Sequence, residues 1–514
     1  MSKTIIIIGA GLAGLSAALQ AAENGCNVKL VSSLPSERAQ SVMAEGGINA
    51  ALNTKDENDS PEEHFTDTIK AACGLADQNA VWGMTQAAPE LVHWLLKLGV
   101  KFNMSGYDDV DLRNFGGQKK KRTAFAQSDT GKQIMTAMID AVRRKEASGM
   151  VERFSHHSFL TLRLCGNICC GCVIRDEYSQ ETVELPGDAV IVATGGMHGL
   201  FGNTTGSLSN TGEVTAELFR LGVPLANGEM IQYHPTTVKC GGKRMLISEA
   251  PRGEGGRLFA MKDGKQWYFM EEKYPELGNL MPRDITAREI WKVSHESEVF
   301  LDMTEISEEI ISNKLSGLVD DCMTYLHKDI RKEPVSVLPG IHYFMGGILV
   351  DEQHRTPIQN LCAAGECCAQ YHGANRLGGN SLLGALYGGR VAAKSACEQA
   401  DVVDLSCATQ IDFPPASQIS EIKQLNKVMQ ETMGVVRNEN TLLNGIKTVQ
   451  ALTGNLPLLG MAVLKSALAR KESRGAHWRE DYPKSNDDDY LKTTVARFDG
   501  KQIQISFVPV PERR

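Results

Sequence analysis

The stretch that decides the fold lies near the start of the chain and reads Thr4-Ile-Ile-Ile-Ile-Gly9-Ala-Gly-Leu-Ala-Gly14. The run of isoleucines predicts a parallel strand that is buried on both faces. Residues 15–22 favour a helix that ends at Gly25, and residues 27–31 predict the next strand. A glycine-rich turn between a strand and a helix is typical of a βαβ unit that binds a dinucleotide.

Each glycine of this turn has a separate expected role. Gly9 allows the tight turn, Gly11 lets a pyrophosphate approach the backbone, and Gly14 lets the helix pack on the strand. The phosphates are then expected at the helix N-terminus, where free N–H groups favour negative charge. The predicted contacts in the turn are Gly9, Ala10, Gly11, Leu12, Ala13 and Gly14.

The end of the second predicted strand departs from the nicotinamide fingerprint. A nicotinamide-binding unit usually places Asp or Glu there for the ribose. This chain has Ser32-Ser33 instead. The departure argues against a simple nicotinamide-dependent dehydrogenase.

Two later segments repeat the strand-and-glycine design. Residues 189–193 precede Thr194-Gly195-Gly196, and residues 360–364 precede Gly365-Glu366. Such strands are expected to join the first, so one Rossmann-like α/β domain is assembled from distant segments. The region between about 230 and 350 is then an inserted domain. Helical periodicity follows at 417–478, and residues 494–498 and 503–508 look like strands.

Composition limits the class of protein. A chain of 514 residues is too long for one core, and a net charge of −8 argues against a nucleic-acid partner. No apolar run approaches the roughly 20 residues that a membrane-spanning helix needs. The 13 cysteines, without a secretory signal, fit the reducing cytosol, so a cytoplasmic location is expected.

The densest group of cysteines is Cys165, Cys169, Cys170 and Cys172. Such a group could bind a metal or an iron–sulfur cluster. Their spacing matches no familiar ligand pattern, however, and Gly166-Asn167 looks like a hairpin turn that would place alternate cysteines on opposite faces. We therefore predict no metal site.

Several short segments bring histidine and arginine together. The segments are 232–236 (QYHPT), 248–256 (SEAPRGEGG), 282–284 (PRD), 342–347 (HYFMGG) and 372–378 (HGANRLG). Arginine holds a carboxylate through a planar fork and stays charged at working pH. A redox cofactor beside such a cluster indicates oxidoreduction of a small dicarboxylic acid.

These segments, with residues 44–49 (AEGGIN), 115–117 (FGG) and 469–477 (ARKESRGAH), closely resemble the fumarate reductase/succinate dehydrogenase flavoprotein family, of which L-aspartate oxidase is a near relative. The resemblance covers nearly the whole chain. It implies an FAD-binding domain at 1–230 and 351–405, an inserted α+β capping domain at 231–350, and a C-terminal helical domain and tail at 415–514.

The resemblance also implies how FAD is held. Beyond the glycine turn, the expected contacts are Ser32, Ser33, Ser41, Gly46, Gly47, Ala193, Thr194, Glu213, Glu366, Ser381 and Leu382. Membrane-complex members link a histidine covalently to FAD where this chain has Gln40. Glutamine cannot form that bond, so FAD is expected to be non-covalent. Loss of the link harms succinate oxidation more than fumarate reduction in the family, which favours the reductive direction.

By the same resemblance, His234, Ser248, His342 and Arg376 hold two carboxylates, and Arg283 is the proton donor. Glu249 and Arg252 match a relay that resupplies its proton, and Phe115 packs against substrate or flavin. Each residue has an alternative when taken alone. His234 could bond to backbone, Phe115 could be core packing only, and three local pairs could be purely structural: Arg252–Glu254, Arg376–Glu366 and Arg283–Asp284.

Other functions also stay open. L-aspartate oxidases carry Glu where this chain has Phe115, which favours fumarate/succinate over aspartate. Ser248 replaces the threonine usual in both groups. An electron-relay flavin subunit without substrate chemistry would tolerate degenerate carboxylate ligands. Because the sequence carries no haem or cluster motif, we expect an iron–sulfur partner subunit and, through partners, contact with the cytoplasmic face of a membrane.

Overall fold

A five-stranded parallel sheet forms the centre of the structure, a computed structural model that describes residues 2–106, 109–399, 413 and 419–513. Its order is β20-β10-β1-β2-β6. The strands are β1 (Thr4–Ile8), β2 (Asn27–Ser32), β6 (Val151–Ser155), β10 (Ala189–Val192) and β20 (Leu361–Ala363). The three strands predicted to end in glycine turns, β1, β10 and β20, are neighbours, so the assembly of one sheet from distant segments is confirmed.

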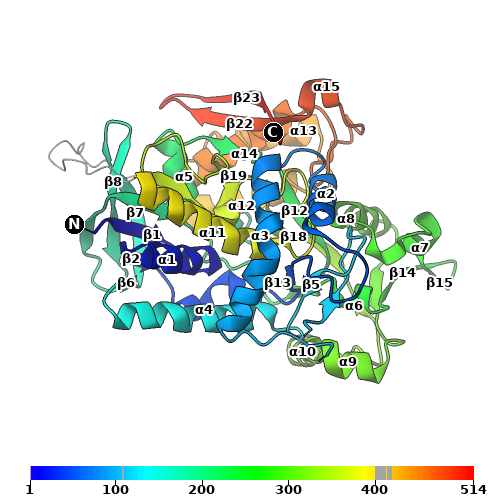
Figure 1. Cartoon of the computed structure of the whole chain (residues 1–514). Helices are drawn as coiled ribbons and strands as arrows, with labels where there is room; N and C mark the ends of the chain where they lie inside the picture. Colours follow the sequence, from blue (N-terminus) through cyan, green and yellow to red (C-terminus); the bar gives the residue numbers. More distant parts are fainter. Residues whose placement is uncertain (1, 107–108, 400–412, 414–418, 514) are drawn as a thin grey trace.

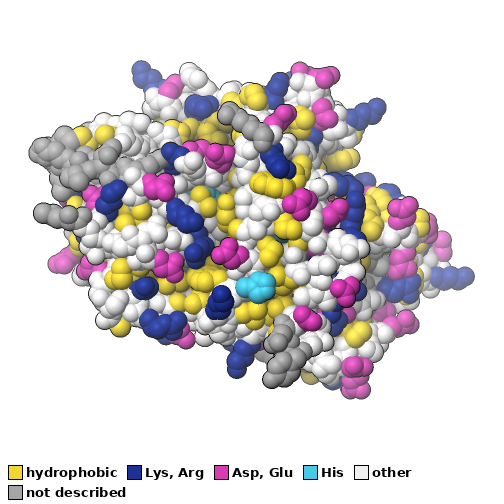
Figure 2. Space-filling view, viewed as in Figure 1, with side chains coloured by type: hydrophobic (Ala, Val, Ile, Leu, Met, Phe, Trp, Pro, Cys, Tyr) yellow, Lys and Arg dark blue, Asp and Glu magenta, His cyan; other side chains and the backbone are white. Residues whose placement is uncertain are grey.

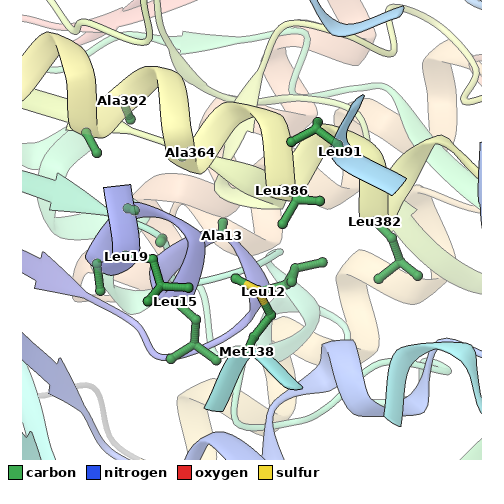
Figure 3. Packing of buried hydrophobic residues seen from close by; sticks show 14 of the residues in the cluster. Leu12, Ala13, Leu15, Leu19, Leu91, Met138, Ala364, Leu382, Leu386 and Ala392 are labelled. Carbon is green, nitrogen blue, oxygen red and sulfur yellow. The ribbon is translucent and has the colours of Figure 1, made fainter. Parts of the chain in front are cut away.

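The isoleucines of β1 are buried on both faces of the sheet. Ile5 and Ile7 pack in a cluster with helix α1 (Leu12–Glu23) and helix α11 (Asn380–Gln399), whereas Ile6 and Ile8 pack in a cluster with the hairpin on the opposite face. Figure 3 shows Leu12, Leu15 and Leu19 of α1 near Leu386 and Ala392 of α11. The helices α2 (Pro61–Ala71), α3 (Gln78–Lys97) and α4 (Thr130–Ala147) complete this side.

The cysteine-rich hairpin covers the other face of the sheet. It consists of β7 (His157–Cys165), β8 (Ile168–Asp176) and β9 (Thr182–Pro186), and the predicted turn at Gly166–Asn167 is confirmed. An irregularity in the β7–β8 register near Cys170 places Cys169 and Cys172 in the same cluster, although an odd spacing would put them on opposite faces. Burial raises the pKa of Cys169 to about 12, which disfavours the thiolate that a metal requires.

Cys165, at the end of β7, is disulfide-bonded. The reducing cytosol that the composition indicated does not predict such a bond.

A second lobe, drawn in green in Figure 1, has its own hydrophobic core. Its sheet has the order β15-β14-β16-β17. The strands are β14 (Arg257–Lys262), β15 (Lys265–Trp267), β16 (Val299–Asp302) and β17 (Val335–Ser336), and the helices are α6 (Ala250–Gly253), α7 (Phe269–Lys273), α8 (Arg283–Val293), α9 (Glu308–Lys314) and α10 (Ser316–Asp321). The exact domain boundaries at 230 and 350 stay a prediction.

A small sheet connects the lobe to the rest of the chain. It has the order β13-β12-β18 and consists of β12 (Ile231–Cys240), β13 (Lys243–Leu246) and β18 (Leu338–Phe344). Strand β12 leads into the lobe and β18 leads out, and the two are antiparallel neighbours. Segments about 100 residues apart therefore lie side by side at the base of the lobe.

The C-terminal region is helical, as predicted, and then forms strands. The helices are α12 (Ile419–Thr432), α13 (Glu439–Val449), α14 (Asn455–Ala469) and α15 (Asp487–Tyr490), and the first three pack with α5 (Glu213–Arg220). The predicted final strands are confirmed as β22 (Lys492–Phe498) and β23 (Ile503–Pro509), which extend a sheet with β11 (Leu225–Ala226), β19 (Gly347–Leu349) and β21 (Cys368–Ala369). The predicted boundaries at 405 and 415 lie outside the described residues.

The surface carries charges of both signs. Figure 2 shows basic and acidic side chains interspersed over the visible face. Among the described residues, no helix combines the length and the apolar character that crossing a bilayer demands.

We predict that Gly9→Ala destabilises the protein far more than Gly25→Ala. Both glycines have positive φ, at 110° and 79°, but a Cβ at Gly9 would lie 2.3 Å from the carbonyl oxygen of Ala193, whereas a Cβ at Gly25 meets nothing within 4 Å. The Gly25 variant should lose about 1 kcal/mol and the Gly9 variant roughly 3 kcal/mol more. Thermal unfolding measures both, and equal losses would contradict the close approach of β1 and β10.

Candidate active site

In the glycine turn after β1, close packing requires glycine at one position, whereas another position has free space beside it. A Cβ at Gly14 would lie 1.8 Å from the carbonyl oxygen of Gly9, so protein atoms alone require glycine there. A Cβ at Gly11 would meet nothing nearer than the Ser41 hydroxyl, at 3.6 Å. The N-terminus of α1 also has no side-chain cap. Space beside Gly11 and free N–H groups suit a pyrophosphate.

Most residues expected to contact FAD follow the carboxyl ends of the central strands. Ser32 ends β2, Ala193 and Thr194 follow β10, and Glu366 lies in the turn after β20. Ser381 and Leu382 lie in the first turn of α11. These ends lie at one edge of a parallel sheet, where open α/β folds bind ligands. The Ser32 hydroxyl is buried without a hydrogen-bond partner in the described residues, which fits a ligand oxygen or nitrogen there. These residues therefore fit FAD.

The other expected contacts lie on short irregular segments. Ser41 accepts a hydrogen bond from the Leu12 amide at 3.3 Å, so this segment lies against the glycine turn. Ser33 is exposed, and Glu213 begins α5 near Arg175, where burial raises its pKa. Gly46 and Gly47 precede β3 (Ile48–Asn49), which pairs with β5 (Thr123–Ala124) and, through it, with β4 (Leu112–Arg113).

Two arginines from different parts of the fold meet at one amide. Arg283, the first residue of α8, and Arg376, from the loop before α11, both donate to the Gln232 side-chain oxygen, at 2.9 and 3.1 Å. Both are nearly fully buried, at 7% and 3% exposure. Arg376 also stacks over the Tyr343 ring at 4.1 Å. Two guanidinium groups therefore converge where little water reaches, which favours an anionic ligand.

Glu249 balances part of this charge. Its carboxylate accepts from Arg283 at 2.8 Å and lies 3.5 Å from Arg252, three residues later in α6. Burial favours the neutral carboxyl, but Arg283 and Arg252 outweigh burial and lower the pKa of Glu249. Burial lowers the pKa of Arg252 to about 10 and that of Arg376 to about 9. The result is a buried row of cation, anion and cation.

The local pairs that the sequence left open are wrong. Glu254 pairs with Lys314 at 3.0 Å rather than with Arg252. Glu366 instead accepts from the Phe344 amide at 3.0 Å, and Arg376 donates to Gln232. Asp284 accepts from Asn375 at 3.1 Å, while Arg283 is buried.

Two histidines lie beside the arginines. The rings of His234 and His342 are 5.1 Å apart. His234 Nδ1 lies near the Thr236 backbone, so the predicted alternative of a bond to backbone holds for this nitrogen. The buried Nε2 of His234 has no partner in the described residues. His342 Nδ1 bonds to the Thr205 hydroxyl at 2.8 Å. Burial, and then the charge of Arg283, hold both pKa values well below 6.5, so both rings are neutral.

Ser248 and Phe115 lie beside the segment that contains Glu45 and Gly46. Phe115 is 3% exposed, and a Cβ at Gly46 or at Gly378 would come within 2.8 or 3.0 Å of its ring. The ring is thus wedged between two glycine segments. The Ser248 hydroxyl bonds to Glu45, and burial together with Asp321 raises the pKa of Glu45 to about 8. Glu45 is therefore mostly protonated at neutral pH.

Sequence reasoning missed several residues of this site. Gln232, Tyr343, Thr205 and Glu45 were not assigned roles. A signal existed for Gln232, since it lies two residues before His234 in a strand and hence on the same face. Gln232 also pairs in register with Tyr343 across β12 and β18. Thr205 and Glu45 reach the site only through tertiary packing.

Comparisons with known proteins agree with this geometry. Residues 4–382 match the FAD binding domain family, and residues 452–513 match the family described as fumarate reductase flavoprotein C-term. The succinate dehydrogenase flavoprotein subunit of Bacillus subtilis is 38% identical, covering 100% of this chain and 98% of the relative. The 8-methylmenaquinol:fumarate reductase flavoprotein subunit of Wolinella succinogenes is 32% identical, covering 100% and 92%. A solved E. coli quinol fumarate reductase FrdA variant superposes with a TM-score of 0.91 at 27% identity, covering 100% and 97%.

We predict strong coupling between Arg283 and Glu249 in a double-mutant cycle. Arg283→Met alone leaves a buried carboxylate short of one partner and should cost about 3–5 kcal/mol of unfolding free energy, part of which a further Glu249→Gln should restore. The exposed pair Arg257–Glu271, at 2.6 Å, is the control and should couple by under about 1 kcal/mol. Denaturant unfolding measures both cycles, and equal coupling would contradict the importance of burial.

Proposed function

Because the chain belongs to the succinate dehydrogenase/fumarate reductase flavoprotein family of FAD-dependent oxidoreductases, we propose that it interconverts fumarate and succinate. The observation that supports this most is the convergence of Arg283 and Arg376 on Gln232, beside two neutral histidines. A dicarboxylate brings two negative charges to a buried site in which Arg283 and Arg252 share the carboxylate of Glu249.

In this proposal four residues hold the substrate. Arg376 binds one carboxylate through its guanidinium, and Ser248, His234 and His342 donate to the carboxylate oxygens. A neutral imidazole suits this role when its Nδ1 accepts a hydrogen bond, as His234 can from the Thr236 amide at 3.3 Å and His342 from the Thr205 hydroxyl at 2.8 Å, because Nε2–H is then left to donate. A bound dianion would in turn offset the charge of the buried guanidinium groups.

Arg283 is the proposed proton donor. Reduction of the double bond adds a hydride to one carbon and a proton to the other, and bound FAD supplies or accepts the hydride. Arg283 delivers the proton and stabilises charge that builds on the substrate. Glu249, at 2.8 Å, returns a proton to Arg283, and Arg252, 3.5 Å from Glu249, supplies it in turn. Burial disfavours the charged form of Arg252, the arginine that ends this relay, and lowers its pKa to about 10.

L-aspartate remains the second candidate substrate because of Glu45. A carboxyl beside Ser248 stands near the expected carboxylate site and could meet an ammonium group. With a pKa of about 8, Glu45 is mostly neutral at pH 7 and is a weak partner for a cation. The apolar ring of Phe115 also disfavours an ammonium, so we favour fumarate/succinate. An electron-relay role is disfavoured, because it needs no cluster of buried carboxylate ligands.

FAD is proposed to be non-covalent. Gln40 begins a short 3-10 turn, Gln40–Met43, just before the Gly46-Gly47 segment, and its amide cannot form the link. The reductive direction is part of this proposal. Succinate oxidation at a rate comparable to fumarate reduction would contradict it. The relatives are named as subunits, and we propose an iron–sulfur partner that brings this chain to the cytoplasmic face of a membrane.

The substrate proposal is tested on the purified holoprotein under anaerobic conditions. Reduced flavin should be reoxidised rapidly by fumarate, and oxidised flavin should not be bleached by L-aspartate. Visible flavin absorbance reports both reactions. Bleaching by L-aspartate, with peroxide formed in air, would instead establish an aspartate oxidase and reject the argument from Phe115.

Arg283→Ala should abolish turnover without loss of FAD. We expect the kcat for fumarate to fall on the order of ten-thousand-fold, because proton delivery and charge stabilisation are both lost. The KM should change only a few-fold, since Arg376 still holds a carboxylate. Arg288→Ala is the matched control, because Arg288 lies on the same helix but stacks on Trp478, at 4.0 Å, and should keep full activity. Full activity of the Arg283 variant removes it from the mechanism.

Acid precipitation should release all of the FAD. A flavin held only by hydrogen bonds and packing leaves the unfolded chain, whereas a covalent flavin stays in the pellet. Flavin absorbance of the supernatant and mass spectrometry of the protein measure the two fractions. A protein mass increased by FAD would contradict the inference drawn from Gln40.

A further inference from the structure

Two thiols face each other at the far ends of the helices that border the FAD site. Cys26 follows the C-terminus of α1, and Cys397 lies in the last turn of α11. Their sulfur atoms are 3.0 Å apart, although the residues are separated by 371 positions in the sequence. Both cysteines are free thiols in the structure.

The backbone holds Cys26 in place. The helix α1 ends in a Schellman-type turn, in which the Cys26 amide donates to Ala21 at 3.0 Å and the Gly25 amide donates to Ala22 at 3.1 Å. Gly25 supplies the left-handed conformation, with φ of 79°. The backbone of Cys26 is therefore fixed, and its sulfur moves only by rotation of the side chain.

Cys397 is held by α11 and by a contact with the N-terminal segment. Its carbonyl oxygen accepts from the Lys3 ammonium at 2.6 Å. Its side chain is only partly buried, whereas that of Cys26 is buried. A small reagent can thus reach the pair from the side of Cys397.

The two helices are packed too closely to separate. The Ser16 hydroxyl of α1 donates to the Leu386 carbonyl of α11 at 2.6 Å, and a Cβ at Gly389 would lie 2.3 Å from the Ala13 carbonyl oxygen. Figure 3 shows Ala13 between the two helices and near Leu386. A disulfide needs a sulfur separation of about 2.05 Å. The sulfurs therefore have to approach by only about 1 Å, which side-chain rotation can supply.

We propose that Cys26 and Cys397 are a reversible disulfide site that staples α1 to α11. The oxidant is a small disulfide. One protein sulfur, as thiolate, attacks it, forms a mixed disulfide and expels one small thiolate. The second protein thiol loses its proton and attacks the mixed disulfide, which expels the second small thiolate. Two electrons pass to the sulfurs of the reagent, and two protons end on the released thiols.

The staple would act on the part of the fold that holds the cofactor. The first turn of α1 follows the glycine turn, and the first turn of α11 contains Ser381 and Leu382. Joining the other ends of these helices closes a very long loop and restricts the unfolded chain. Oxidation should therefore slow the loss of FAD without touching any residue of the active site.

The test uses the full-length holoprotein treated with oxidised glutathione at pH 8.5. Digestion with trypsin and a glutamate-specific protease isolates Cys397 from Cys407, because Glu398 lies between them. Mass spectrometry should find the peptide of Cys26 linked to that of Cys397, and dithiothreitol should separate them. The link should be absent from Cys397→Ser and present in the matched control Cys240→Ser, which alters another partly exposed cysteine.

The second readout is the temperature at which flavin fluorescence appears on heating. Oxidation should raise it by about 3 °C or more in the natural protein. The shift should vanish in Cys397→Ser, which leaves the Cys165 disulfide unchanged. If Cys240 becomes glutathionylated while Cys26 and Cys397 stay unlinked, the site is rejected. If the disulfide forms but the temperature of FAD release does not change, the proposed effect on FAD retention is rejected. Neither result depends on the substrate, so failure here is distinct from failure of the proposed activity.

Discussion

The burial of like charge is the constraint on which the site depends. Arg283, Arg376 and Arg252 are each less than a tenth exposed, and cations without water need a carboxylate or strong acceptors nearby. Glu249 and the Gln232 oxygen supply these partners. Arg283 belongs to the helix α8 of the second lobe, whereas Arg376 belongs to the loop before α11. The hydrogen bonds that balance the buried charge therefore also join the second lobe to the FAD-binding sheet.

The central fold could be predicted because its signals are local. Four isoleucines in a row fit only an element buried on both faces, and Ile5 to Ile8 alternate between two cores as a strand requires. Glycine turns after β1, β10 and β20 mark ends of strands that share one edge. The β7–β8 irregularity near Cys170 carries no such signal, because it depends on the register with a partner strand. Sequence alone therefore assigned the hairpin but not the faces of its cysteines.

The sequence identified residues that the structure brings close together, but it did not predict how they pair. Neighbours in sequence suggested Arg252–Glu254 and Arg376–Glu366, and both were wrong. Residues two apart in a turn or ten apart across a loop seldom point at each other, whereas α6 brings Glu249 to Arg252 by its i, i+3 spacing. Gln232 and Glu45 received no role from the sequence, because glutamine and glutamate are common on protein surfaces. Only burial and partners reveal that one bridges two arginines and the other bonds to Ser248.

Under the proposed function, the neutral histidines let the site both bind and release a dianion. If His234 and His342 were protonated, the pocket would add two cations to the arginines and hold a dicarboxylate too tightly to turn over. Burial and the field of Arg283 keep both rings uncharged, so they donate directional hydrogen bonds at lower electrostatic cost. A dianion bound nearby reverses that field and raises the proton affinity of both rings. In the proposed reaction, binding of the dianion would therefore be linked to proton uptake by the site.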